Sequence, residues 1–99
     1  MSLKVYEIDG RKFQTFQEFA KEFGDTVIEG YAVSNLNAFN DVLRGGFGTP
    51  DEGFVLIWKH SDVSKLALGE DRFWRLVNII QRHGAGGIES EDNVVLRLE

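Results

Sequence analysis

Five consecutive apolar residues, Phe54-Val55-Leu56-Ile57-Trp58, lie near the middle of a chain of 99 residues. A strand with one face in water alternates between apolar and polar side chains, whereas a strand buried on both faces does not. This segment does not alternate. We therefore predict that it is a central strand with both faces buried.

Two further β-prone segments lie near the ends of the chain. Val5, Tyr6 and Ile8 precede the turn dipeptide Asp9-Gly10, which ends the first strand. Residues 93–98 form the last strand. The sequence therefore predicts three strands that are far apart along the chain.

Apolar residues at helical spacing predict two helices between the first and central strands. The first follows Thr15, which has capping-box spacing to Glu18, and Gly24 ends it. The second has Ser34 as its N-cap and spans 34–44. We expect the intervening residues 25–33 to be an extended connection.

Two more helical segments precede the last strand. A short one is predicted near 62–68, and a longer one over 70–82 is ended by Gly84. Helical crossovers between strands favour a parallel sheet with right-handed connections. The length is that of one compact domain, so we predict a single α/β domain over 1–99 in the order β-α-α-β-α-α-β.

Composition excludes several functional classes. The net charge of -5 disfavours binding to a nucleic-acid backbone and favours a basic partner. The absence of cysteine removes thiolate nucleophiles and thiolate metal sites, and is compatible with a reducing compartment. The chain has neither a signal-peptide pattern nor an apolar run of about 20 residues, so we expect a cytoplasmic protein without a membrane span.

The sequence contains no concentrated set of catalytic groups. His60 follows the central strand and His83 ends a helix, and structural roles are expected for both. The glycine cluster at 45–48 follows a helix and precedes a strand, which is the reverse of known phosphate loops. The adjacent acidic residues at turns and helix starts are expected to serve capping and solvation: Asp51-Glu52, Glu70-Asp71 and Glu91-Asp92. We predict no enzyme, no cofactor and no metal site.

The helix over 34–44 has two distinct sides at about 100° per residue. The apolar side holds Leu36, Ala38, Phe39, Val42 and Leu43. The polar side holds Asn37, Asn40, Asp41 and Arg44. Such a polar side is either ordinary solvated surface or a binding face.

The order Asn35-Leu36-Asn37-Ala38-Phe39-Asn40-Asp41-Val42-Leu43, preceded by Tyr31 and followed by Gly45, resembles the signature helix of the barstar family. These proteins are intracellular inhibitors of small ribonucleases. The likeness extends to Ile8-Asp9-Gly10, to the aromatic spacing of the first helix, to Leu56-Ile57-Trp58 and to the closing helix and strand. It covers most of the chain.

The resemblance implies a three-stranded parallel sheet flanked by helices, in which helix 34–44 and the adjoining loop block a ribonuclease active site. It places Asp41 where an aspartate takes the place of the RNA phosphate. It also assigns interface roles to Tyr31, Asn35 and Gly45. The implied partner is a basic ribonuclease or ribonuclease-like toxin, bound by a chain that is monomeric when free.

Three positions depart from the family pattern. A second family aspartate is Asn37 here, an interface tryptophan is Asn40, and an acidic residue of the last helix is Ile79. Arg44 follows Asp41 by three residues and is expected to pair with it on the helix surface. Arg44 joins the predicted partner-binding residues, together with Asn37 and Asn40.

Two other functions remain open at this stage. The departures favour an interaction module of the same fold whose partner is not a ribonuclease. A small hydrolase using His60 would need an acid within hydrogen-bond reach of that ring in a cleft.

Overall fold

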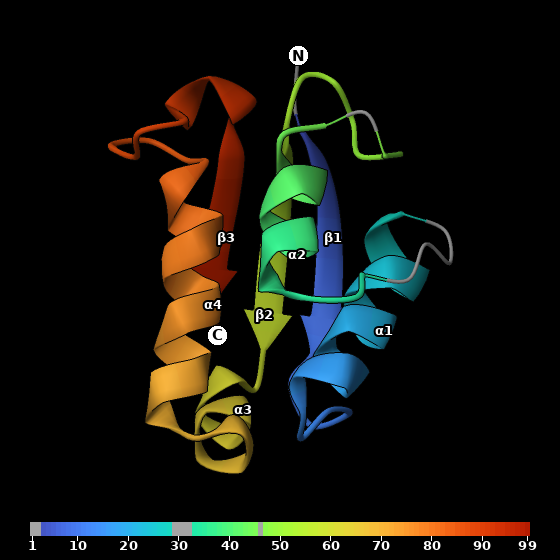
Figure 1. Ribbon diagram of the computed structural model, residues 1–99, viewed down its shortest axis with the longest axis vertical. Coiled ribbons are helices and arrows are strands. Elements are labelled where there is room, and N and C mark those ends of the chain that lie inside the picture. Colours follow the sequence, from blue (N-terminus) through green and yellow to red (C-terminus); the bar gives the residue numbers. More distant parts are fainter. Residues whose placement is uncertain (1–2, 29–32, 46) are drawn as a thin grey trace.

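Three parallel strands form one sheet in the order β1-β2-β3 (Figure 1). They are β1 (Lys4–Asp9), β2 (Phe54–Lys59) and β3 (Val94–Leu98). The register aligns Val5 with Val55 and Val55 with Val95. The predicted central strand is therefore confirmed.

The computed structural model describes residues 3–28, 33–45 and 47–99. Within these ranges the α-helices are α1 (Phe16–Val27), α2 (Leu36–Leu43), α3 (Ser61–Leu68) and α4 (Glu70–Arg82), and a 3-10 turn spans Ser90–Asp92. The order is the predicted β-α-α-β-α-α-β. None of the helices described is long and apolar enough to cross a membrane.

The first helix extends further than predicted. It continues through Gly24 to Val27, so ending it at Gly24 was wrong, as was the extended conformation expected for residues 25–27. Val27 is buried with Phe19 and Phe23 and continues the same apolar side of α1. Its burial offsets the cost of about 1 kcal/mol for a glycine inside a helix.

The N-cap of α2 is Asn35 and not Ser34. Asn35 has extended backbone, and its Oδ1 accepts a hydrogen bond from the Ala38 backbone N–H at 2.8 Å. Both residue types cap helices well, so local preference alone does not separate them. The helix ends at Arg44 and Gly45, as predicted, and Gly45 has a φ of 102°.

The two faces of the sheet are covered unequally. Along β2, Phe54, Leu56 and Trp58 are buried, while the residues between them are only half-buried. The half-buried residues lie on the opposite face of the sheet. On that face Val5 is 54% exposed and Val95 is 39% exposed. The expectation that the central strand is buried on both faces was therefore wrong, because α1, α2 and α4 pack over one face only (Figure 1).

Aromatic side chains join this covered face to the helices. The Trp58 ring lies 5.3 Å from that of Phe19 on α1 and 5.2 Å from that of Phe73 on α4. Trp58 Nε1 donates to Ser64 Oγ, and this buried hydroxyl donates to the Gly10 carbonyl, both at 2.9 Å. The polar atoms of this part of the core are thereby satisfied.

Candidate functional site

Helix α2 is fixed to the core by its apolar side. Phe39 is fully buried, and its ring meets those of Phe19 and Phe23 edge-on at 5.3 and 5.0 Å. Val42 and Leu43 are also buried. In Figure 1, α2 lies in front of β2 with its opposite side facing outward. Burial of one side thus holds the outward side in a defined position.

Asp41 lies on the outward side of α2. Its side chain is 54% exposed, and Oδ1 accepts a hydrogen bond from Arg44 Nη1 at 2.7 Å. The ion pair expected between these residues is confirmed. Among the residues described, Arg44 is the only polar partner of this carboxylate. The carboxylate therefore remains accessible to a larger molecule.

Arg44 also bridges α2 to the segment before β3. Its Nε donates to Glu89 Oε1 at 2.6 Å and its Nη2 to Glu89 Oε2 at 3.3 Å. Arg82, at the end of α4, donates to the same Glu89 at 3.0 Å. The hydrogen bond from Arg44 lowers the pKa of Glu89, and the same bond raises the pKa of Arg44. Glu89 thus anchors the arginine that holds Asp41.

Asn40 points toward α4 and not fully outward. It is half-buried, and its Oδ1 lies 2.6 Å from Nε2 of the buried His83. The other ring nitrogen of His83, Nδ1, lies 2.6 Å from Asp92 Oδ2. The structural role expected for His83 is confirmed, and the predicted polar side of α2 is interrupted at Asn40 because a buried ring needs its amide.

Three further predicted residues, Asn35, Asn37 and Gly45, lie on α2 or directly next to it. Asn37 is exposed, and Asn35 is exposed but uses its side chain as the helix cap. Gly45 follows the helix with open space where a Cβ would be. Tyr31 lies outside the described residues. Partner contacts of these residues stay predictions.

Ile79 does not extend the polar surface. It is half-buried and packs against the core. Three other residues, which the sequence analysis did not select as site residues, contribute instead: His83, Glu89 and Asp92. Glu89 is 45 residues from Arg44, so no local pattern links them. The position of His83 at the predicted end of a helix was the one signal in the sequence, and it pointed to a structural role.

The structure provides no catalytic arrangement around His60. This residue is exposed with a left-handed backbone (φ 53°), and its ring has no hydrogen bond to any described residue. Nearby Asp9 is held by Arg11 at 2.9 Å, and this hydrogen bond lowers the pKa of Asp9. A groove of about 490 Å³ beside His60 is also lined by Glu7, Glu22 and Glu99, but no carboxylate of the described residues forms a hydrogen bond with its ring, as a hydrolase would need.

His83, Glu89 and Asp92 are the one described group with metal-ligand character. Their ligand atoms lie within 4.8 Å of one another. However, Glu89 is bound by two arginines, and both nitrogens of His83 already have oxygen neighbours. A cation would have to displace these contacts and lie beside two guanidinium groups, so the group is better explained as a structural network.

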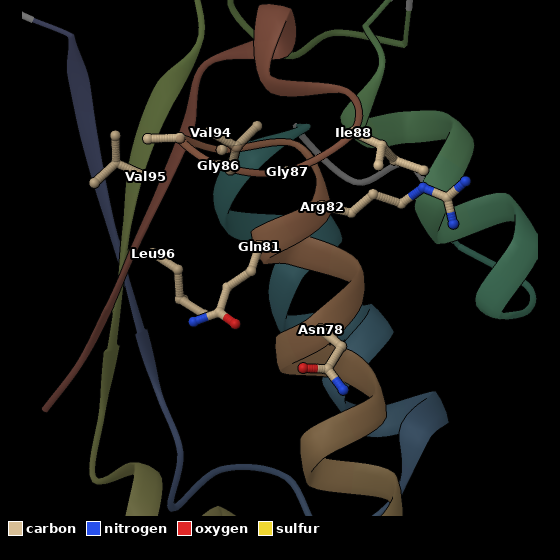
Figure 2. Close-up of a pocket in the computed structure, with 11 residues that line it drawn as sticks. Asn78, Gln81, Arg82, Gly86, Gly87, Ile88, Val94, Val95 and Leu96 are labelled. Atoms are coloured by element: carbon tan, nitrogen blue, oxygen red, sulfur yellow. The ribbon is translucent and has the colours of Figure 1, made fainter.

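A groove of about 810 Å³ lies on the other side of α4, next to β3 (Figure 2). Gln81 and Leu96 border it from α4 and β3, whereas Arg82 and Ile88 extend on the side nearer α2 (Figure 2). Its lining contains no nucleophile, histidine or carboxylate. This groove adds no catalytic chemistry to the surface formed by α2.

Comparison with models of protein families places the whole domain in one family. A scan against models of protein families matches residues 3–98 to the family described as Barstar (barnase inhibitor). A search of the curated proteins finds no match. The matched region includes every strand and helix that the structure describes.

Proposed function

Because this chain belongs to the barstar family, whose members are inhibitors and not enzymes, we propose that it inhibits a small ribonuclease related to barnase. In this proposal α2 and the adjoining loop occupy the enzyme's active site. The Asp41 carboxylate stands where a phosphate of the RNA substrate would bind. The inhibitor acts in the cytoplasm on a basic toxin before that toxin can damage the producing cell.

The observation that carries the proposal is the position of Asp41. It is exposed on a helix whose opposite side is buried, so little conformational freedom is lost when a partner binds. A ribonuclease cleft carries cationic groups that hold phosphate. A fixed carboxylate offers them charge-assisted hydrogen bonds without a bond that can be cleaved.

The ion pair with Arg44 does not prevent this role. It holds the Asp41 side chain in one orientation through a contact of 2.7 Å, and the pair is accessible to solvent. Exposed pairs of this kind contribute only about 0.3 to 0.5 kcal/mol. Several cationic groups in an enzyme cleft therefore outcompete one arginine for the carboxylate.

The test uses Asp41→Asn, which keeps the shape and removes the charge. Asp25→Asn is a matched control, because Asp25 is 53% exposed and also forms a 2.8 Å ion pair within its own helix, with Lys21. Inhibition of RNA hydrolysis by barnase and calorimetric affinity are measured for both variants. We expect Asp41→Asn to weaken the complex by about tenfold or more, since hydrogen bonds to charged groups contribute about 1.5 to 3 kcal/mol.

Equal inhibition by the two variants would contradict the role of Asp41. The unaltered chain could also inhibit neither barnase nor any ribonuclease from its own cell. That result would favour the alternative function. In that case the protein is an interaction module of the same fold whose partner is not a ribonuclease.

A further inference from the structure

A second feature of the same surface is a groove of about 550 Å³ between α1, α2 and α4. Its apolar lining comes from Phe16, Leu36, Leu68 and Leu76. Leu68 and Leu76 are buried, while Phe16 and Leu36 are only partly covered. The groove therefore presents apolar surface that the fold itself does not cover.

The rim of this groove is cationic. Arg72 and Arg75 line it from α4, and both are exposed. Neither forms an ion pair with any carboxylate in the part of the chain that the structure describes. The neighbouring acidic residue Glu70 is instead 3.5 Å from Lys65. These two arginines, three residues apart on one helix, thus carry positive charge outside the described ion pairs, although Asp71 directly precedes Arg72.

The groove is continuous with the surface assigned to the partner. Asn35 and Asn37, at the beginning of α2, line it opposite Arg72 and Arg75. Figure 1 shows α4 beginning near the bottom of the view and α2 near its middle, and both helices rise in the same direction. One end of the surface thus carries the two arginines, and the other carries Asp41 and Glu89.

The residue at position 37 does not neutralise these arginines. Asn37 is exposed and has no charge, so among the described residues that line the groove none carries a negative charge opposite the two arginines. A basic segment of a partner would be repelled here, whereas a carboxylate would be attracted. The guanidinium groups offer paired N–H donors that match the two oxygens of a carboxylate.

We propose that this groove binds an acidic segment of the partner, in which a carboxylate side chain lies next to an apolar one. The carboxylate pairs with Arg72 and Arg75, and the apolar side chain covers Phe16 and Leu36. This inference rests on the proposed function, because the occupant belongs to the same partner that Asp41 contacts. The partner therefore presents basic groups to Asp41 and an acidic segment beside the beginning of α2.

The groove is tested without any ribonuclease. The ¹⁵N-labelled protein is titrated with the peptide acetyl-Leu-Asp-Leu-Glu-Leu-amide and with its uncharged counterpart acetyl-Leu-Asn-Leu-Gln-Leu-amide. We expect saturable shifts at the amides of Gln17, Asn37 and Leu76, with about fivefold weaker binding of the uncharged peptide. The double variant Arg72→Gln/Arg75→Gln should bind the acidic peptide about fivefold more weakly than the unaltered chain does.

A matched double variant, Lys12→Gln/Arg97→Gln, removes two positive charges away from the groove and should bind the acidic peptide as the unaltered chain does. Equal shifts with both peptides, or equal binding by the two double variants, would overturn the proposal. Inorganic phosphate that binds as tightly as the acidic peptide would also overturn it, in favour of a small-anion site.

A second measurement connects the groove to the partner. In a complex that Asp41→Asn weakens, Arg72→Gln/Arg75→Gln should reduce affinity by about fivefold, and the Lys12/Arg97 variant should not. Unchanged affinity there would show that the partner does not use the groove. Failure of the peptide titration bears on the groove alone, whereas failure of the Asp41→Asn test bears on the role of Asp41 alone.

Discussion

Arg44 lies between two carboxylates that come from distant parts of the chain. Its Nη1 is 2.7 Å from Asp41 Oδ1, and its Nε is 2.6 Å from Glu89 Oε1. Glu89 in turn accepts a hydrogen bond from Arg82. The residue proposed to mimic phosphate is thus linked through Arg44 and Glu89 to Arg82 at the end of α4.

Replacement of Arg44 tests whether it competes with the partner for Asp41. Arg44→Gln removes both the ion pair and a positive charge that faces a basic enzyme. We expect about twofold tighter binding of a ribonuclease inhibited through Asp41, since exposed pairs contribute about 0.3 to 0.5 kcal/mol. Calorimetry measures the change, with Arg97→Gln as the control of equal charge. Weaker binding would mean that Arg44 itself contacts the partner.

Replacement of His83 tests the buried link between α2 and α4. His83→Ala leaves a cavity and removes the partner of both Asn40 and Asp92, so we expect a loss of about 2 to 4 kcal/mol in the free energy of unfolding. Urea denaturation measures it. His60→Asn is the control, because His60 is exposed and asparagine tolerates its left-handed backbone. A loss no larger than that of the control would refute the structural role of His83.

The ionised form of Glu89 predicts a pH dependence of stability. Its pKa is lowered in the folded protein by the hydrogen bond from Arg44. A lowered pKa gives stabilisation that is complete above the unfolded value of about 4.3 and is lost as the pH falls through the folded value. We therefore expect Glu89→Gln to lower the melting temperature at pH 7, and this lowering to become smaller as the pH falls below about 4.

The control for this experiment is Glu91→Gln, which removes the same charge two residues away, outside the ion pairs described for Glu89. Its melting temperature should stay close to that of the unaltered chain at both pH values. If Glu89→Gln lowered the melting temperature equally at pH 7 and pH 3, the stabilising role of the ionised Glu89 carboxylate would be contradicted.

Local sequence patterns predicted most of the secondary structure. The apolar run at 54–58 and the spacing of apolar residues in α2 and α4 follow from which side chains must leave water, and these segments were found where expected. The two errors at helix ends, Gly24 and Ser34, concern residues whose local preference was overruled. In one case the burial of Val27 decided the outcome, and in the other the side chain of Asn35 reached the Ala38 N–H.

The sequence by itself determined the order of the elements, the family resemblance and the outward position of Asp41, because each depends on residues close together in the chain. Only the tertiary structure decided which groups surround that aspartate. Arg44 meets Glu89, Asn40 meets His83, and Arg72 and Arg75 border the beginning of α2. These contacts join residues far apart in sequence, and ion pairs and hydrogen bonds leave no periodic signal in the chain that forms them.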